Sequence, residues 1–288
     1  MPAEVACIGA AHWDIVGRAT RPPAAGDELP GRVARCAGGL ALDLALGLAR
    51  AGVRVELITA LGRDTEGDIL LEIAARAGVM TGRSLRLDAP TGCHVAIEGP
   101  DGSLFSAVAD SLDTGTAGVR LLEPLARGPC PPLVVADDSL DPAASTRLLT
   151  LPVSRLILVP ARPARAARLR PALARGRASL ILNRAGAEAM LGRPFRDSRI
   201  AAAALCAAGA HEAVVTDGRL PASRTGPEGT VTVPPPPGAA GVPPGADAAF
   251  AAALIAADLA GHAPDAALAR ALATFEEGRL NENREPPR

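Results

Sequence analysis

Several polar side chains and glycines of this sequence stand where a predicted strand ends or a predicted helix begins. They are Asp14, the pair Gly38-Gly39 followed by Asp43, Asn183, the stretch Thr216-Asp217-Gly218, and the turn at Gly245. Carboxylates accept hydrogen bonds from hydroxyl groups, and helix N-termini present free backbone amides to anions. Ligands of open α/β sheets bind beyond the carboxyl ends of the strands. The pattern therefore predicts a site for a hydroxyl-bearing ligand and a phosphate.

Each of these positions also has a purely structural interpretation. Asp14 can be a surface carboxylate after the first strand, and Gly38-Gly39 a flexible entry to a helix. Asn183 can simply cap the helix that follows it. Their joint placement at strand ends and helix starts favours a site more than any single residue does.

The elements needed to position these residues follow an α/β order. Residues 4–9 read as a buried strand, 40–51 as a helix, 53–62 as strand and loop, and 64–78 as a helix. Further buried strands are predicted at 132–137, 155–160, 178–183 and 211–218, with helices between them and near 246–260 and 264–275. Strands that alternate with helices predict a mainly parallel sheet.

Two segments interrupt this order. Residues 91–110 hold two β-rich runs around Gly99-Pro100-Asp101-Gly102, which predicts a hairpin. Residues 28–36 alternate like an exposed strand. We expect these pieces to form a small antiparallel sheet set apart from the main one.

Composition narrows the classes of function. The 288 residues carry a formal net charge of −1, with 48% hydrophobic and 21% charged residues. No basic stripe appears, so neither nucleic acid nor an anionic membrane is expected as a partner. No lysine is present, which excludes Schiff-base chemistry and a lysine phosphate contact. The five scattered cysteines lack CxxC spacing and predict no metal site, no disulfide framework and a cytoplasmic location, and we expect no signal peptide and no transmembrane span.

Several stretches together resemble the ribokinase-like carbohydrate kinases, also called the PfkB family. CAGGLALDLALGLARAG (36–52) is similar to the N-terminal signature of that family, and PPGADAAFAAALIAADLAG (243–261) to its C-terminal signature. LNRAGAEAMLG (182–192) and VVTDG (214–218) resemble two further family segments. Within the family, the chain is most similar to pseudouridine kinase, and this similarity lies in residues 8–19, 100–110 and 133–140.

The resemblance implies a fold, an activity and a set of roles. It implies one α/β domain over 1–288, with a three-layer arrangement, a mainly parallel central sheet flanked by helices, and a small antiparallel β lid formed by approximately 20–37 and 91–110. It implies transfer of the γ-phosphoryl group of ATP, with Mg²⁺, to a hydroxymethyl group of a sugar or nucleoside. Family members often pair their lids, so a homodimer through the lid is expected. The implied substrate-binding residues are Asp14, Gly38, Gly39 and Asp43, the nucleotide-binding residues are Asn183, Thr216 and Gly218, and the anion hole is Gly245 and Ala246.

The sequence departs from the family pattern where the chemistry should lie. The catalytic aspartate falls on Ala248, and the last glycine of the anion hole falls on Asp247. A general base contributes about 10²–10⁴-fold to the rate, and a carboxylate in an anion hole repels phosphate. The other departures are Asp43 for asparagine, Gly186 for glutamate, Val242 for aspartate, Pro221 for glycine and Ser139 for asparagine.

Two main interpretations remain open. In the first, the chain is an active sugar or nucleoside kinase in which Asp247 replaces the base missing at Ala248. In the second, it is an inactive pseudokinase that binds a sugar or nucleoside, or a structural or regulatory subunit. Because phosphoryl transfer depends almost wholly on positioning and electrostatics, these departures from the family pattern argue against catalytic activity.

Overall fold

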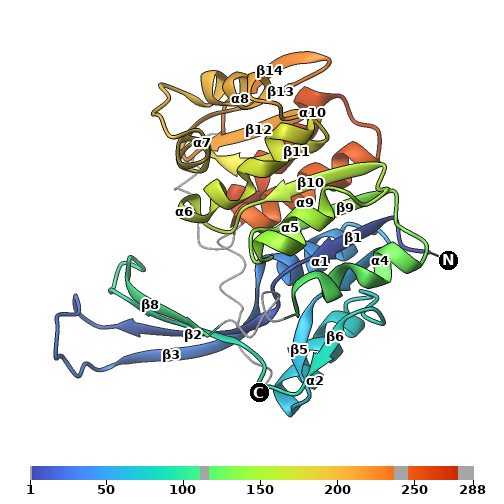
Figure 1. The fold of residues 1–288 in the computed structure, drawn as a ribbon. Coiled ribbons are helices and arrows are strands. Elements are labelled where there is room, and N and C mark those ends of the chain that lie inside the picture. Colours follow the sequence, from blue (N-terminus) through green and yellow to red (C-terminus); the bar gives the residue numbers. More distant parts are fainter. Residues whose placement is uncertain (1, 111–116, 237–245, 278–288) are drawn as a thin grey trace.

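The computed structural model describes residues 2–110, 117–236 and 246–277. Its centre is an eight-stranded sheet in the order β14-β13-β12-β11-β10-β9-β1-β4 (Figure 1). Six strands, from β12 to β4, are parallel, and β13 and β14 complete one edge in antiparallel pairing. The strands are β1 Val5–Ile8, β4 Val55–Ile58, β9 Leu133–Asp137, β10 Arg155–Val159, β11 Ala178–Asn183, β12 Glu212–Asp217, β13 Leu220–Gly226 and β14 Gly229–Val233. The predicted parallel α/β sheet is confirmed.

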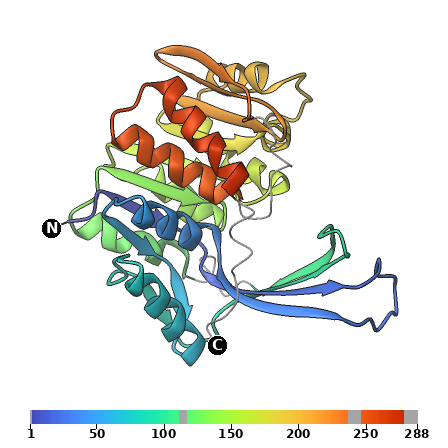
Figure 2. The ribbon, with the colours of Figure 1, turned by 180° about the vertical axis from the view of Figure 1, so that it is seen from behind.

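Helices cover both faces of this sheet (Figures 1 and 2). One apolar core lies beneath η1 Gly118–Leu122, α4 Glu123–Arg127, α5 Pro142–Leu148, α6 Pro163–Ala166, η2 Ala167–Arg175, α7 Arg184–Leu191 and α8 Ser198–Ala207. The other lies beneath α1 Leu40–Arg50, α2 Thr65–Arg76, α9 Ala246–Leu259 and α10 Pro264–Glu277. Strands β1, β4 and β9 are buried along their whole length, as their continuous apolar runs require.

A second sheet of four strands projects from the body and forms the lid (Figure 1). Its order is β3-β2-β7-β8, with β2 His12–Ala19, β3 Gly31–Gly38, β7 Cys93–Glu98 and β8 Leu104–Asp110. The hairpin predicted within 91–110 is the pair β7–β8. Strand β2 also belongs to the lid, where it pairs with β3 in antiparallel and with β7 in parallel register. The lid therefore contains a strand that follows β1 directly in the chain.

Two short strands, β5 Ala60–Gly62 and β6 Leu85–Leu87, form a small parallel pair next to α2. Within the described part of the chain, no helix has both the length and the apolar character needed to cross a membrane.

Candidate functional site

A cleft of about 870 Å³ lies between the lid and the carboxyl ends of β1 and β9. Cavities of this size are typical of small-molecule sites. Strands β2, β7 and β8 of the lid, α1, the loop after β9, the start of α6 and the first turn of α9 all contribute to its lining. Its ionisable lining residues are His12, Asp14, Asp43, His94, Glu98, Asp110, Asp137, Asp138, Asp141, Arg162, Arg165, Arg168 and Asp247.

The two glycines at the end of β3 are required by close approach of other groups. A Cβ on Gly38 would lie 2.1 Å from Oδ2 of Asp14. Gly39, the residue before α1, has a φ of 102°, and a Cβ there would lie 2.4 Å from the carbonyl oxygen of Ala10. A side chain at position 38 would therefore displace the Asp14 carboxylate, and one at position 39 would displace the backbone between β1 and β2.

Asp14 and Asp43 face the same cleft from two different elements. Asp14 lies in β2, and its side chain is 20% exposed. Asp43 lies in the first turn of α1. The structure thus brings together Asp14, Gly39 and Asp43, which the sequence assigns to the substrate, while Gly38 makes room for Asp14.

Asp137 at the end of β9 fixes the connection between β1 and β2. Its carboxylate accepts hydrogen bonds from the Ala10 amide at 2.8 Å, from the Ser139 amide at 2.9 Å and from the Ser139 hydroxyl. Burial raises the pKa of Asp137, and these hydrogen bonds oppose that effect. A Cβ on Gly9 would overlap this carboxylate at 2.2 Å, which explains the glycine after β1.

Asp138 is buried at the wall of the cleft with one oxygen atom unsatisfied. Its Oδ1 accepts a hydrogen bond from the Ala161 amide at 3.0 Å. Its Oδ2 has no hydrogen-bond partner among the residues that the structure describes, although its side chain is only 1% exposed. Burial raises the pKa of Asp138 to about 6, with the nearby charge of Arg165 acting against the shift. A hydroxyl or amine donor on a ligand would satisfy this oxygen.

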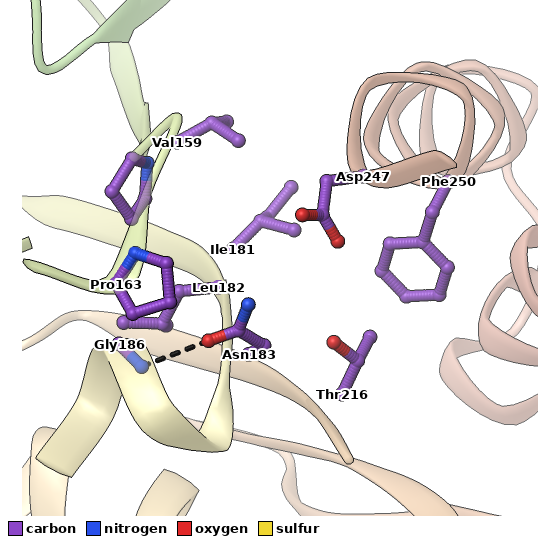
Figure 3. A pocket seen from close by; sticks show the side chains of 10 residues that line it. Val159, Pro163, Ile181, Leu182, Asn183, Gly186, Thr216, Asp247 and Phe250 are labelled. Carbon is purple, nitrogen blue, oxygen red and sulfur yellow. Dashed lines mark hydrogen bonds between the residues drawn. The ribbon is translucent and has the colours of Figure 1, made fainter. Parts of the chain in front are cut away.

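A second, small pocket lies over the carboxyl ends of β10, β11 and β12 (Figure 3). Asn183 caps α7 there, since its Oδ1 accepts a hydrogen bond from the Gly186 amide at 2.8 Å. Thr216, at the end of β12, is buried and lines the same pocket. The pocket holds only about 10 Å³, so a nucleoside does not fit inside it.

Asp247 is the residue that the two cavities share. It lies in the first turn of α9, and its carboxylate points toward the space between Ile181 and Thr216 (Figure 3). It also lines the large cleft. Burial raises its pKa, and no hydrogen bond or ion pair joins its carboxylate to the rest of the described chain. An unpaired, desolvated carboxylate is a stronger proton acceptor than a solvated one.

The remaining residues that the sequence assigns to the site do not all lie at the two cavities. Ala246 begins α9 and is buried, and Ala248 is buried at the edge of the large cleft. Gly218 lies in the turn after β12 with a φ of 60°, outside the lining of both cavities. Gly245 falls outside the described residues.

The described residues offer little protein support for a metal ion. They contain no group of three or more histidine, cysteine, aspartate or glutamate side chains that could hold one. Position 186, where the resemblance places a glutamate, is a glycine beside Asn183. Mg²⁺ is usually held by one or two carboxylates, waters and substrate phosphates. The site therefore suits Mg²⁺ as a complex with a nucleotide rather than as an ion held by the described side chains alone.

Sequence analysis did not find several residues of the cleft. Asp137 and Asp138 stand directly after the run PLVVA, which is the same signal that singled out Asp14 and Asn183. His12, His94 and Arg162 gave no comparable signal, because the first two meet by strand pairing within the lid and Arg162 reaches His94 from the body.

Several known proteins are similar to this chain in sequence or in structure. Residues 2–113 match the pfkB family carbohydrate kinases, and no curated protein matches the chain. A carbohydrate kinase from Agrobacterium tumefaciens superposes with a TM-score of 0.80 at 27% identity, covering 95% of this chain and 90% of that one. A ribokinase from Arabidopsis thaliana, solved with ribose and ATP, gives a TM-score of 0.74 at 18% identity, with 96% and 92% covered. An adenosine kinase from Sinorhizobium meliloti gives 0.72 at 16% identity, with 96% and 93% covered.

The fold is ribokinase-like. The predicted fold class is therefore confirmed over nearly the whole chain, including the β lid. In this ribokinase-like arrangement the large cleft lies beneath the lid, and the small pocket lies beside it at the carboxyl ends of the next strands. The N-terminal part of the chain carries the match to the pfkB carbohydrate kinases.

Proposed function

We propose that the protein is a kinase that transfers a phosphoryl group from ATP to a hydroxymethyl group of a ribose-type sugar or nucleoside, with pseudouridine as one candidate. The observation that carries this proposal is the position of Asp247, which lines both cavities. Asp247 accepts the proton of the attacking hydroxyl, taking the role of the base missing at Ala248. Its raised pKa improves it as a proton acceptor.

The large cleft holds the sugar in this proposal. Asp14 and Asp43 accept hydrogen bonds from ring hydroxyls, and the glycine at position 39 lets the sugar approach the backbone. The free Oδ2 of Asp138 accepts a further hydroxyl or N–H donor. Because carboxylates accept hydrogen bonds, a cleft lined by so many of them favours a ligand rich in hydrogen-bond donors.

Asn183 and Thr216 line the nucleotide side, and we assign the amide of Ala246, at the start of α9, to the transferred phosphate. ATP supplies the phosphoryl group when it is bound, with Mg²⁺ on its phosphates. The Thr216 hydroxyl lies at the small pocket, and α9 directs its positive N-terminal end toward the transferred phosphate. Because the small pocket is so narrow, the nucleotide lies over it rather than in it.

A second candidate function is that of a pseudokinase that binds a sugar or nucleoside for a regulatory or structural purpose. Two observations favour it: the small volume of the nucleotide-side pocket and the glycine at position 186. In that case Asp14, Asp43 and Asp138 keep their roles while Asp247 has none in catalysis.

We also infer a homodimer formed through the lid. Val33, Ile97 and Val108 share the face of the lid that points away from the cleft, and their exposed fractions are 77%, 40% and 69%. An apolar sheet face with open edge strands invites pairing with a second copy. The cytoplasmic location stays a prediction of the sequence.

The decisive experiment measures ADP formation with ribose, pseudouridine and adenosine as acceptors. We expect Asp247→Asn to lower turnover at least about 100-fold while changing sugar affinity little. The matched control is Asp88→Asn, because the Asp88 side chain is 92% exposed and lines neither cavity. Equal turnover in wild type and Asp247→Asn would contradict the role of Asp247.

Ligand-induced thermal stabilisation separates the two candidate functions. Stabilisation by a sugar or nucleoside without stabilisation by Mg-ATP supports the pseudokinase, because a ligand stabilises the state it binds. In that case the double variant Gly186→Glu and Ala248→Asp should gain turnover. A Cβ at position 186 comes no closer than 3.4 Å to its neighbours, so the glutamate can be accommodated. Absence of binding by any sugar or nucleotide would refute both candidates.

A further inference from the structure

A chain of contacts joins the lid to the body across the cleft. His94 in β7 stands beside Asp14 in β2, and its Nδ1 lies 3.3 Å from Oδ1 of Asp14. On the other side of the ring, Nε2 lies 2.6 Å from Nη2 of Arg162, the residue before α6. One imidazole thus contacts a carboxylate of the lid and a guanidinium of the body.

These two partners determine the protonation of the ring. A guanidinium only donates hydrogen bonds, so Nε2 of His94 has to accept. The single proton of a neutral imidazole then resides on Nδ1, where it faces the Asp14 carboxylate. A second proton on Nε2 would meet the N–H of Arg162 and place two positive charges in contact.

The charged and titratable groups around His94 come from the lid and from the body. Asp14 and His12 face it from β2, and Arg162 faces it from the start of α6. Burial lowers the pKa of His94, and the neighbouring Arg162 and His12 lower it further, while Asp14 acts in the opposite direction. The net effect is a lowered pKa, so the ring is neutral at pH 7.

We propose that neutral His94 is a positioning residue that orients Asp14 toward a substrate hydroxyl and ties the lid to the body through Arg162. Protonation of His94 breaks the contact with Arg162 and redirects the hydrogen bond of Asp14. The orientation of the hydroxyl rests on the proposed function, whereas the tie between lid and body does not depend on any ligand.

The first test needs no ligand. The full chain contains four histidines, so long-range ¹H–¹⁵N NMR of the imidazole rings can resolve them, with His94→Gln identifying the signals of His94. We expect a neutral ring at pH 7.5 with the proton on Nδ1. We also expect Arg162→Gln to raise the titration midpoint of His94, because it removes a positive neighbour. A proton on Nε2, or a midpoint that Arg162→Gln leaves unchanged, would overturn the proposal.

The second test measures affinity for ribose and pseudouridine by calorimetry at pH 7.5 and pH 5.5. The glutamine of His94→Gln can reach the position of Nε2 and keep the contact with Arg162, but it cannot titrate. We expect acidification to weaken binding to the wild type about tenfold more than to His94→Gln, as loss of a hydrogen bond to a charged group implies. His262→Gln is the matched control, because His262 is exposed and remote from the cleft.

The two tests fail in distinguishable ways. If the NMR result is as expected but the wild type binds neither compound at either pH, the tie between lid and body stands and the proposed function is refuted for these substrates. If the wild type binds and His94→Gln has the same pH profile, the positioning role is wrong while the proposed function stands.

Discussion

The carboxylate of Asp14 occupies the space that a side chain at position 38 would need. Its Oδ2 lies 2.1 Å from the place of a Cβ on Gly38, so the glycine at the end of β3 and the aspartate in β2 form one unit. The neighbouring Gly39 is fixed by a different constraint, a positive φ beside the Ala10 carbonyl. Positions 38 and 39 thus require glycine for two different structural reasons.

Gly38→Ala is expected to weaken sugar binding without unfolding the protein. The new methyl group displaces the Asp14 carboxylate into the cleft, while the backbone at position 38 is extended strand that accepts alanine. We expect an affinity loss of at least about tenfold in calorimetry, which corresponds to about 1.4 kcal/mol. Gly82→Ala is the control, since a Cβ there meets nothing within 4 Å. Unchanged affinity in Gly38→Ala would show that Asp14 does not bind the sugar.

Asp138 is expected to make the free energy of unfolding depend on pH. Its pKa is about 6 in the folded protein and near 3.8 in the unfolded chain. The folded state therefore binds more protons between these values, and the destabilisation caused by Asp138 is complete above pH 6 and disappears as the pH falls toward 4. Asp138→Asn should be more stable than the wild type at pH 8, by up to roughly 3 kcal/mol, and the gain should shrink at pH 5.

Denaturant titrations at pH 8 and pH 5 check this expectation, with Asp88→Asn as an exposed control. The same Asp138→Asn variant should bind sugar more weakly, because the neutral amide replaces a charged acceptor. A stability difference that does not change between the two pH values would refute the assigned origin of the effect.

Arg224 is expected to be a major contributor to the stability of the C-terminal half. It lies in β13, is 11% exposed, and bonds Glu212 in β12 at 2.7 Å and Asp258 in α9 at 2.7 Å. Arg224→Met leaves two partly buried carboxylates unpaired, which should cost about 3–5 kcal/mol of unfolding free energy. Arg76→Met removes an exposed pair with Glu72 and should cost less than about 1 kcal/mol. Similar losses in the two variants would contradict this interpretation.

The inferred dimer depends on the outer face of the lid. Val33→Glu and Val108→Glu place charges on that face and should shift the protein toward the monomer in analytical ultracentrifugation. Leu220→Glu changes a side chain of similar exposure, 55%, on β13 and should leave the oligomeric state unchanged. A wild type that is monomeric at all concentrations would disprove the inference directly.

The sequence predicted the elements of the body well because their physical signals are local. Buried apolar runs mark β1, β9 and β11, and periodic leucines and alanines mark α1. The segment near 161–175 differs from the single helix predicted there. It is a short α6 followed by the 3₁₀ helix η2, which contains Pro171, a residue without the N–H that an α-helix needs.

The lid and the site were less predictable because their contacts are distant in the sequence. The sequence predicts no element for residues 12–19, and only the pairing of β2 with β3 and β7 makes this segment the centre of the lid. The sequence singles out Asp14, Gly39 and Asp43 because each follows a predicted strand or lies at the start of a predicted helix, and the structure places all three along the large cleft. The contact between His94 and Arg162 spans 68 positions and carries no pattern that a single sequence could reveal.

Strand β2 begins only four positions after β1 ends, and the chain returns to α1 directly after β3. The connection from β1 to β2 and the connection from β3 to α1 each contain a glycine with a positive φ, Gly9 at 147° and Gly39 at 102°. A side chain at either position would collide with its neighbour, because Gly9 abuts Asp137 and Gly39 abuts Ala10. The two connections between body and lid are thereby built against the same residues, Asp137 and Ala10, that line the large cleft.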